Sequence, residues 1–362
     1  MRGARITIAG AGKRECGMTT QDSRRTRASG RPTLEQVAIE ANVSRGTASR
    51  VVNGSLEVSP WALKAVNDAI RKLGYVPNHA ARSLVTQRSD TVLLVVSESE
   101  DRVFGEPFFA SIVRGLSHEL SNTPLQLNLM MANTPRQHGR VEQQVRNGHV
   151  DGVLMISLHG DDPLPRNLMA AGTPVALIGR PMSDIGATPY VDADNESGAR
   201  TATDYLYRQG RRRIATITGP QDMAAGIDRL AGYRAALRGK RGVTRLVAQG
   251  DFGQASGEAA TRELLAKDPT LDAIFAASDL MAAGALRTLR AAGRRVPDDV
   301  AVIGFDDSEV ARHTDPTLTS VRQPIQEMGR ELAKLLITQL RDRDTKLSPV
   351  ILPTDLICRE SA

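Results

Sequence analysis

Residues 32–59 read PTLEQVAIEANVSRGTASRVVNGSLEVS and hold two short amphipathic segments with a turn between them. Thr33 can cap a helix whose apolar residues recur every three or four positions, and Ser44 can cap a second helix that extends to about Val52. Asn42 lies between them, and asparagine tolerates the left-handed backbone that a tight turn needs. The stretch therefore predicts two helices joined by a tight turn.

A third helix is predicted after this pair. Ser59 is a capping residue, Pro60 suits the first helical position, and Gly74 ends the apolar pattern. Three short helices with a tight turn between the first two form a helix-turn-helix unit, which we place at residues 32–77. A linker at 78–88 follows, with a helix too short to be stable alone in water.

The rest of the chain has another rhythm. After residue 88, short β-branched apolar runs alternate with amphipathic segments, which predicts an α/β fold with parallel sheets. The expected strands fit two doubly wound sheets better than one. No glycine-rich dinucleotide turn follows the first strand, so we expect no cofactor. The expected strands are 91–96, 125–131, 152–156, 175–178, 214–217, 244–248, 273–276, 300–304 and 348–352.

Positive charge is concentrated near the N-terminus. Residues 1–31, which lack apolar periodicity and are expected to be a disordered tail, contain eight Lys or Arg against two acidic residues. Residues 32–85 carry a net charge of +2, whereas the remaining residues carry −2. This asymmetry predicts a polyanionic partner at the N-terminal end and a different role for the core.

Several classes of protein are disfavoured by composition. Cys16 and Cys358 stand at opposite ends of the chain, which argues against a disulfide framework or a cysteine zinc site, and no histidines show metal-binding spacing. No apolar run is long enough to cross a membrane, and the apolar stretch near residue 1 is too short for the hydrophobic region of a secretory signal. We therefore expect a cytoplasmic, nucleoid-associated protein with no metal, no membrane partner and no catalytic residues, and hence not an enzyme.

The helix-turn-helix stretch and the segment LGYVPNHAARSL at 73–84 resemble the lactose/galactose-repressor (LacI/GalR) family of transcription regulators. The core adds EPFFASIVRGL at 106–116, VDADNESGA at 191–199 and VPDDVAVIGFDDSE at 296–309, which are similar to family signatures and stand in family order. The resemblance covers about residues 32–360.

This resemblance implies a two-lobed core similar to periplasmic sugar-binding proteins, at residues 89–362. We place the N-terminal lobe at about 89–190 and 323–347, and the C-terminal lobe at about 191–320 and 348–360. The resemblance also implies a homodimer, which would bind a pseudo-palindromic operator in double-stranded DNA.

The start of the second helix is expected to read base edges in the major groove. Arg45 and Arg50 can each form a bidentate contact with guanine, although they could instead form only a solvated face. In the family the short linker helix enters the minor groove, where Leu84 matches an apolar wedge between base pairs. The expected DNA-binding residues are Thr33, Leu34, Ser44, Arg45, Gly46, Thr47, Ser49, Arg50, Asn53, Tyr75, Asn78, His79, Ala81, Arg82 and Leu84.

The resemblance places a small-molecule effector between the lobes. The positions that match family effector contacts are Phe109, Arg180, Arg229, Phe252, Asp279 and Asp306. Aromatic rings can stack on a sugar, and the charged groups can pair with hydroxyls or an anion. Met223 stands where purine-responsive members carry a basic residue, so we expect a sugar or sugar phosphate. Asp279 could instead cap its helix, Asp306 could hold a turn, and Arg180 could form a surface ion pair.

The expected function is that of a transcriptional regulator, a repressor whose operator affinity is controlled by a sugar or sugar derivative. Two alternatives stay open at this point. The chain could be a sugar- or nucleoside-binding protein without a DNA role, or a regulator that responds to a protein co-repressor.

Overall fold

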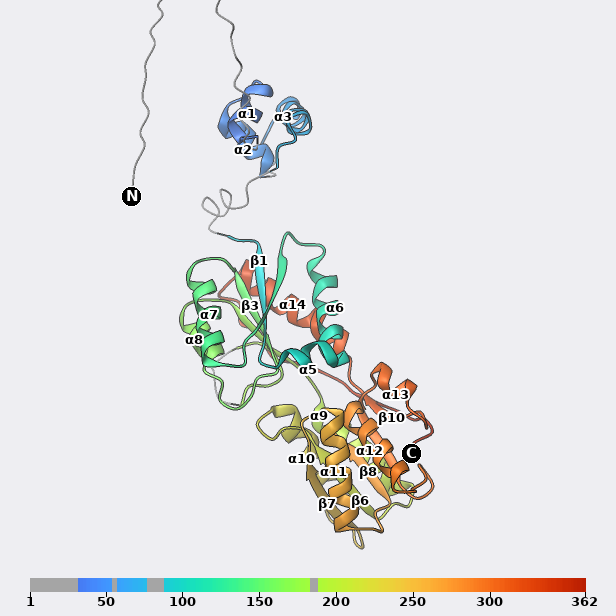
Figure 1. Cartoon of the computed structure of the whole chain (residues 1–362). Coiled ribbons are helices and arrows are strands. Elements are labelled where there is room, and N and C mark those ends of the chain that lie inside the picture. Colours follow the sequence, from blue (N-terminus) through green and yellow to red (C-terminus); the bar gives the residue numbers. More distant parts are fainter. Residues whose placement is uncertain (1–31, 54–56, 77–87, 183–187) are drawn as a thin grey trace, which may run out of the picture. The chain divides into compact units, whose positions relative to one another are not determined.

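The computed structural model describes residues 32–53, 57–76, 88–182 and 188–362, and the chain divides at residue 78 into two compact units (Figure 1). The expected tail at 1–31 lies outside the described residues, as do residue 77 and residues 78–87 of the expected linker. Within its described residues the first unit contains three helices, α1 (Leu34–Glu40), α2 (Arg45–Val52) and α3 (Pro60–Leu73). They enclose a small core of Val37, Ala38, Ala41, Ala48, Val51, Val66 and Ala69.

Local sequence explains where these helices begin and end. The Thr33 side chain accepts a hydrogen bond from the backbone N–H of Gln36, and the Gln36 side chain accepts one from the backbone N–H of Thr33. This capping box starts α1. Ser44 Oγ accepts from Thr47 N at 3.1 Å and starts α2. Asn42, in the turn, has a φ of 51°, and Gly74 ends α3 with a φ of 62°. The predicted helices and their tight turn are confirmed.

The second unit contains two sheets of six strands each. The first has the order β11-β5-β4-β3-β1-β2 and pairs only in parallel, while the second has the order β12-β10-β9-β8-β6-β7, with β12 antiparallel to β10. The strands of the first sheet are β1 (Thr91–Val96), β2 (Gln126–Met131), β3 (Gly152–Ile156), β4 (Val175–Ile178), β5 (Tyr190–Ala193) and β11 (Val350–Leu352). Those of the second are β6 (Arg213–Thr218), β7 (Thr244–Gln249), β8 (Ala273–Ala276), β9 (Ala301–Asp306), β10 (Thr319–Arg322) and β12 (Asp355–Ile357).

Helices cover both faces of each sheet, which is why the central strands are apolar on both sides. The N-terminal lobe, which contains the first sheet, has a hydrophobic core on each face of that sheet. One core includes Val92, Leu94 and Val96 of β1, and the other includes Leu93 and Val95. The helices of this lobe are α5 (Glu100–Gly105), α6 (Pro107–Leu120), α7 (Pro135–Arg146), α8 (Leu164–Ala170) and α14 (Ile325–Arg341). The second lobe has α9 (Asn195–Arg208), α10 (Ala224–Ala236), α11 (Gln254–Lys267), α12 (Asp279–Ala291) and α13 (Glu309–His313).

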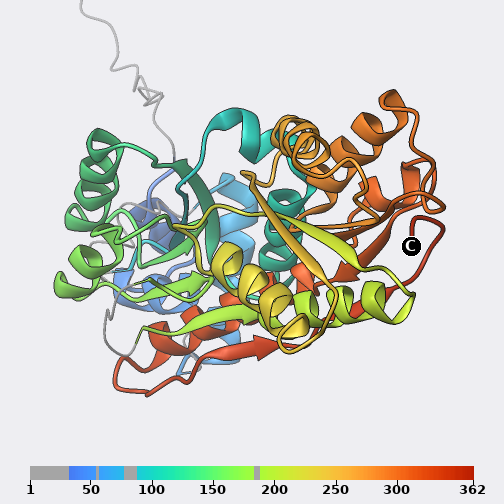
Figure 2. The same ribbon diagram turned by 90° about the horizontal axis from the view of Figure 1, so that it is seen from below.

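The chain passes between the lobes three times, after β5, after β10 and after β11. In both views the green part of the N-terminal lobe and the orange part of the C-terminal lobe remain separate bodies (Figure 2). Three chain segments connect the two lobes. The loops at the carboxyl ends of the parallel strands face the cleft between the lobes.

The expected lobe boundaries need correction. Residues 191–193 and 350–352, which we assigned to the C-terminal lobe, form β5 and β11 and pair with each other in the first sheet. β5 and β12 are also absent from the expected strands, whereas β10 lies where the resemblance implies that strands cross between the lobes, near residues 317–323. β5 contains the polar Asp192, and β12 has only three residues and begins with Asp355, so neither shows a continuous apolar run. Within the described residues, no helix has the length and apolar character needed to span a membrane.

Candidate functional site

The exposed face of α2 carries the residues predicted to read DNA. Arg45, Gly46 and Arg50 are exposed, and Thr47 is half-buried. The guanidinium of Arg50 reaches only a backbone carbonyl, with Nε 3.4 Å from Gly46 O. The exposed side chain of Arg50 can therefore meet a surface outside the unit.

Three of the expected DNA contacts, Arg45, Leu34 and Tyr75, have neighbours within the first unit. Arg45 Nε lies 4.0 Å from Glu35 Oε1 with both side chains mostly exposed, so the attraction between them is weak. Leu34 and Tyr75 pack against the core of the first unit and help to support the helices. Asn78, His79, Ala81, Arg82 and Leu84 lie outside the described residues.

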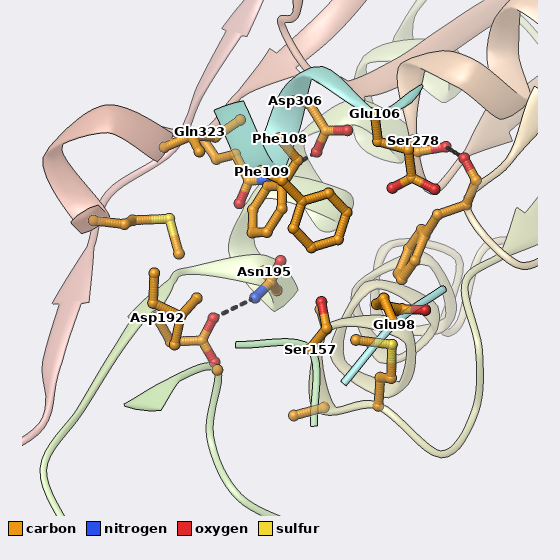
Figure 3. A pocket seen from close by; sticks show the side chains of 18 of the residues that line it. Glu98, Glu106, Phe108, Phe109, Ser157, Asp192, Asn195, Ser278, Asp306 and Gln323 are labelled. Atoms are coloured by element: carbon orange, nitrogen blue, oxygen red, sulfur yellow. Dashed lines mark hydrogen bonds between the residues drawn. The ribbon is translucent and has the colours of Figure 1, made fainter. Parts of the chain in front are cut away.

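A cavity of about 970 Å³, part of it open to solvent, lies between the two lobes of the second unit. Five of the six expected effector residues line it, namely Phe109, Arg180, Arg229, Phe252 and Asp306. Figure 3 shows how side chains from both lobes gather around it.

Asp279 is the exception, since it lies behind the cavity wall. It is 1% exposed, and its Oδ2 accepts from Ser308 N at 2.7 Å while its Oδ1 meets Ser320 Oγ at 2.5 Å. The neighbouring Ser278, rather than Asp279, caps α12. Burial raises the pKa of Asp279 well above the ordinary carboxyl value. Its role in the structure is to hold β10 and the loop after β9 against α12.

Arg229 organises the deep end of the cavity from α10. Its Nε donates to Asn195 Oδ1 at 2.8 Å, and its Nη1 donates to Ala277 O at 2.6 Å and lies 3.6 Å from Asp306 Oδ1. The guanidinium also stacks 3.7 Å from the centre of the Phe305 ring. Because it is buried, desolvation lowers its pKa. Arg229 thus fixes the positions of polar groups that a ligand would meet.

Arg180 lies across the mouth of the cleft. Its Nη2 donates to Asp228 Oδ1 on α10 at 2.8 Å, so an N-terminal-lobe cation pairs with a C-terminal-lobe carboxylate. Its backbone N–H donates to Asp192 Oδ2 at 3.0 Å. The ion pair that we considered for Arg180 therefore exists, and it joins the two lobes.

Three non-glycine cavity residues have left-handed backbones. Ser157 has a φ of 58°, Phe252 of 73° and Asp306 of 114°. Such conformations cost free energy and persist where packing enforces them, and they concentrate at functional sites. Asp306 is further held by Gln323 Nε2, which donates to Oδ1 at 2.6 Å.

Several cavity residues were missing from the expected set. Glu98 follows β1, Arg102 lies on α5, and Glu106 precedes α6. Phe108 adds a ring that meets Phe109 edge-on at 5.4 Å. Glu106 and Phe108 stand inside the quoted motif EPFFASIVRGL, so their position after the first strand could have identified them. The other missed lining residues with polar side chains are Ser157, Asp192, Asn195, Ser278, Ser308 and Gln323.

Comparison with known proteins now decides the family. Residues 33–78 match the model of bacterial regulatory proteins of the lacI family, and residues 203–362 match a periplasmic binding protein-like domain. The HTH-type transcriptional regulator CelR of Thermobifida fusca is 53% identical over 334 residues, covering 91% of this chain and 98% of CelR. The chain belongs to the LacI family.

Other LacI-family proteins extend the comparison. The transcriptional repressor CytR of Escherichia coli K12 is 33% identical, with 91% of this chain and 96% of CytR covered. A solved CelR–cellobiose complex is 51% identical with a TM-score of 0.73, and covers 92% of this chain and all of that one. A lac repressor dimer bound to operator and the anti-inducer ONPF is 25% identical with a TM-score of 0.80, and covers 92% of this chain and 99% of that one.

The predicted family and fold class are therefore confirmed. Like its relatives in the LacI family, the chain is a DNA-binding transcriptional regulator, not an enzyme. The helix-turn-helix unit and the inter-lobe cavity are its two candidate functional sites.

Proposed function

We propose that this regulator is a dimeric repressor in the cytoplasm, associated with the nucleoid, and that a sugar between its core lobes controls its affinity for an operator. The observation that carries the proposal is the presence, in one LacI-family chain, of an exposed arginine-bearing helix α2 and an inter-lobe cavity lined by aromatic and carboxylate side chains.

The chemistry of the cavity suits a sugar. Phe108, Phe109 and Phe252 offer apolar surface on which the faces of a pyranose ring can pack. Asp192 and Asp306 offer carboxylate oxygens that can accept from hydroxyls, and Asn195 lies between them. The relative that is 51% identical was solved with cellobiose, which makes this disaccharide the first ligand to test.

The DNA side of the proposal rests on α2. We assign base reading to Arg45 and Arg50, and backbone positioning to Thr33, Ser49 and Asn53. Leu84 is proposed as the minor-groove wedge by resemblance to the family. Two copies of α2 related by a two-fold axis would read a pseudo-palindromic site.

The test uses the full chain. Double-stranded sequences are selected from a random pool, and the affinity for the best sequence is measured with and without cellobiose. We expect a pseudo-palindromic consensus and a change in DNA affinity of about 5- to 150-fold on addition of the sugar. Binding without sequence preference, or an affinity that no member of a panel of mono- and disaccharides changes, would overturn the proposal.

A further inference from the structure

The cavity contains three arginines, and each of them already has a carboxylate partner. Arg102 pairs with Glu98 and Glu106, Arg180 pairs with Asp228, and Arg229 pairs with Asp306, as the contacts in the structure show. A phosphate group needs a cation to compensate its charge when water is removed. None of these three lining arginines offers one without the loss of an existing ion pair.

Arg102 is held most completely. Its Nε and Nη2 donate to the two oxygens of Glu106 at 2.7 and 3.4 Å, and its Nη1 donates to Glu98 Oε1 at 2.9 Å. The side chains of Glu98 and Glu106 are only 7% and 13% exposed, so solvent screens these pairs weakly. The trio Glu98–Arg102–Glu106 thus presents one cation and two anions to the cavity.

The remaining charges increase this excess. Asp192 and Asp306 also line the cavity, so four carboxylates stand against three arginines. The negative charge of Asp251 also acts on the trio. Burial raises the pKa of Glu106, and the charges of Glu98 and Asp251 raise it further. A bound anion would lie close to these negatively charged carboxylates. Because the groups are poorly hydrated, the repulsion lowers the affinity for the anion by several powers of ten.

Two features favour an anion, namely the imidazole of His159, which when protonated pairs with both Glu98 and Asp222, and the start of helix α10. Helix α10 begins at the cavity, with Ala224 and Ala225 in the lining, and no side chain caps it. The partial positive charge of such a helix end is worth at most roughly a factor of 30 in affinity. The carboxylate excess outweighs both, because a phosphate would face several of these groups at once.

We infer that the cavity selects a neutral polyhydroxylated ligand and rejects its phosphorylated form, and that Glu106, by holding Arg102, is a residue that sets this selectivity. The inference rests on the proposed sugar-controlled function and narrows it. A neutral sugar can donate hydroxyl hydrogens to the carboxylates and leave the ion pairs intact.

The experiment measures dissociation constants of the full chain for cellobiose and for cellobiose phosphorylated at a 6-hydroxyl, by calorimetry. We expect the phosphorylated probe to bind at least roughly 100-fold more weakly. Equal or tighter binding of the phosphorylated probe would overturn the inference while leaving control by a sugar in place. Failure of both probes to bind would overturn the proposed effector together with the inference.

Two variants assign the role to Glu106. Glu106→Gln removes one anion and releases part of Arg102, so the ratio of the two dissociation constants should fall by at least about tenfold. Asp101→Asn makes the same charge change at an exposed position of α5 that does not line the cavity, and it should keep the ratio of the native protein. Thermal melting confirms that both variants are folded. An unchanged ratio in folded Glu106→Gln would contradict the assignment to Glu106.

Discussion

His159 and Asp222 join the two lobes of the core: His159 Nδ1, in the loop after β3, lies 2.9 Å from Asp222 Oδ2, in the loop after β6. The other ring nitrogen, Nε2, lies 3.1 Å from Glu98 Oε1, a cavity carboxylate that also pairs with Arg102. The backbone reinforces this contact, since Gly160 N donates to Asp222 O at 2.7 Å. The imidazole therefore connects the ligand cavity to the closure of the cleft.

The affinity for sugar should depend on pH through this contact. Only a protonated imidazole can donate to both carboxylates, and its hydrogen bond with Glu98 is the main cause that raises the pKa of His159 above its ordinary value of 6.5. Protonated His159 stabilises the contact between the lobes. This stabilisation is complete below about pH 6.5 and is lost as the pH rises through the raised pKa of His159. We expect the dissociation constant for cellobiose to increase over that upper range.

His159→Gln should flatten this pH profile, because a glutamine amide does not titrate. His149→Gln is the matched control, since His149 is exposed and bonds only within its own lobe, to Gln144. Calorimetric titrations at several pH values provide the measurement. The account of the contact fails if His159→Gln retains the pH dependence of the native protein.

Arg229→Ala should lower the free energy of unfolding by roughly 3–5 kcal/mol, because it removes a buried cation and leaves the half-buried Asp306 without its partner. Arg234→Ala, at an exposed position of the same helix, should change it by less than about 0.5 kcal/mol. Urea unfolding of the full chain measures both. The double variant Arg229→Met with Asp306→Asn should cost less than the sum of the single changes, since neither group is then left unpaired.

Two helical glycines should respond in opposite directions to alanine. A Cβ at Gly115 in α6 would lie 2.1 Å from Gln326 O at the contact with α14, so Gly115→Ala should force these helices apart. Gly139 in α7 has open space around it, and Gly139→Ala should stabilise the protein by about 0.4–1 kcal/mol. Urea unfolding again distinguishes them. Equal effects of the two substitutions would show that α6 and α14 do not need their close approach.

The proposed reading of DNA by α2 predicts a change in specificity as well as in affinity. Arg50→Ala should cost about 1–3 kcal/mol on the preferred operator and relax the preference at one base position in each half-site. Lys64→Ala removes the same charge from the exposed surface of α3 and should leave the base preference unchanged. Binding to an operator library with single-base changes measures both effects. If Arg50→Ala lowers the affinity for every DNA sequence by the same factor, Arg50 contacts backbone phosphates and does not read a base.

The sequence predicted the features that local patterns determine. Caps, turn residues and apolar spacing located the three helices of the first unit, and both-face apolar runs located the central strands. The short strand β5 was not predicted because Tyr190–Ala193 contains the polar Asp192, whose burial depends on bonds from Arg180 N, Ala193 N and Asn195. Hydrogen bonds that satisfy a buried carboxylate leave no periodic trace in the sequence.

The same reason explains the errors at the cavity. Asp279 matches a family contact position, yet Ser308 and Ser320 draw its carboxylate behind the wall. Glu98 and Arg102 could not be assigned from sequence, because their function depends on each other and on a cleft formed by distant segments. Residue type located the lining aromatics and arginines, but only the fold showed that the arginines are already paired.

The central claim is that the cavity and the DNA-reading unit are energetically coupled. It is tested most directly by the dissociation constant of the full chain for cellobiose, measured with saturating operator and with a scrambled duplex of equal length. Coupling is reciprocal, so we predict that the operator changes sugar affinity by the same factor, about 5- to 150-fold, by which the sugar changes operator affinity. Equal sugar affinity on the operator and on the scrambled duplex would contradict the claim.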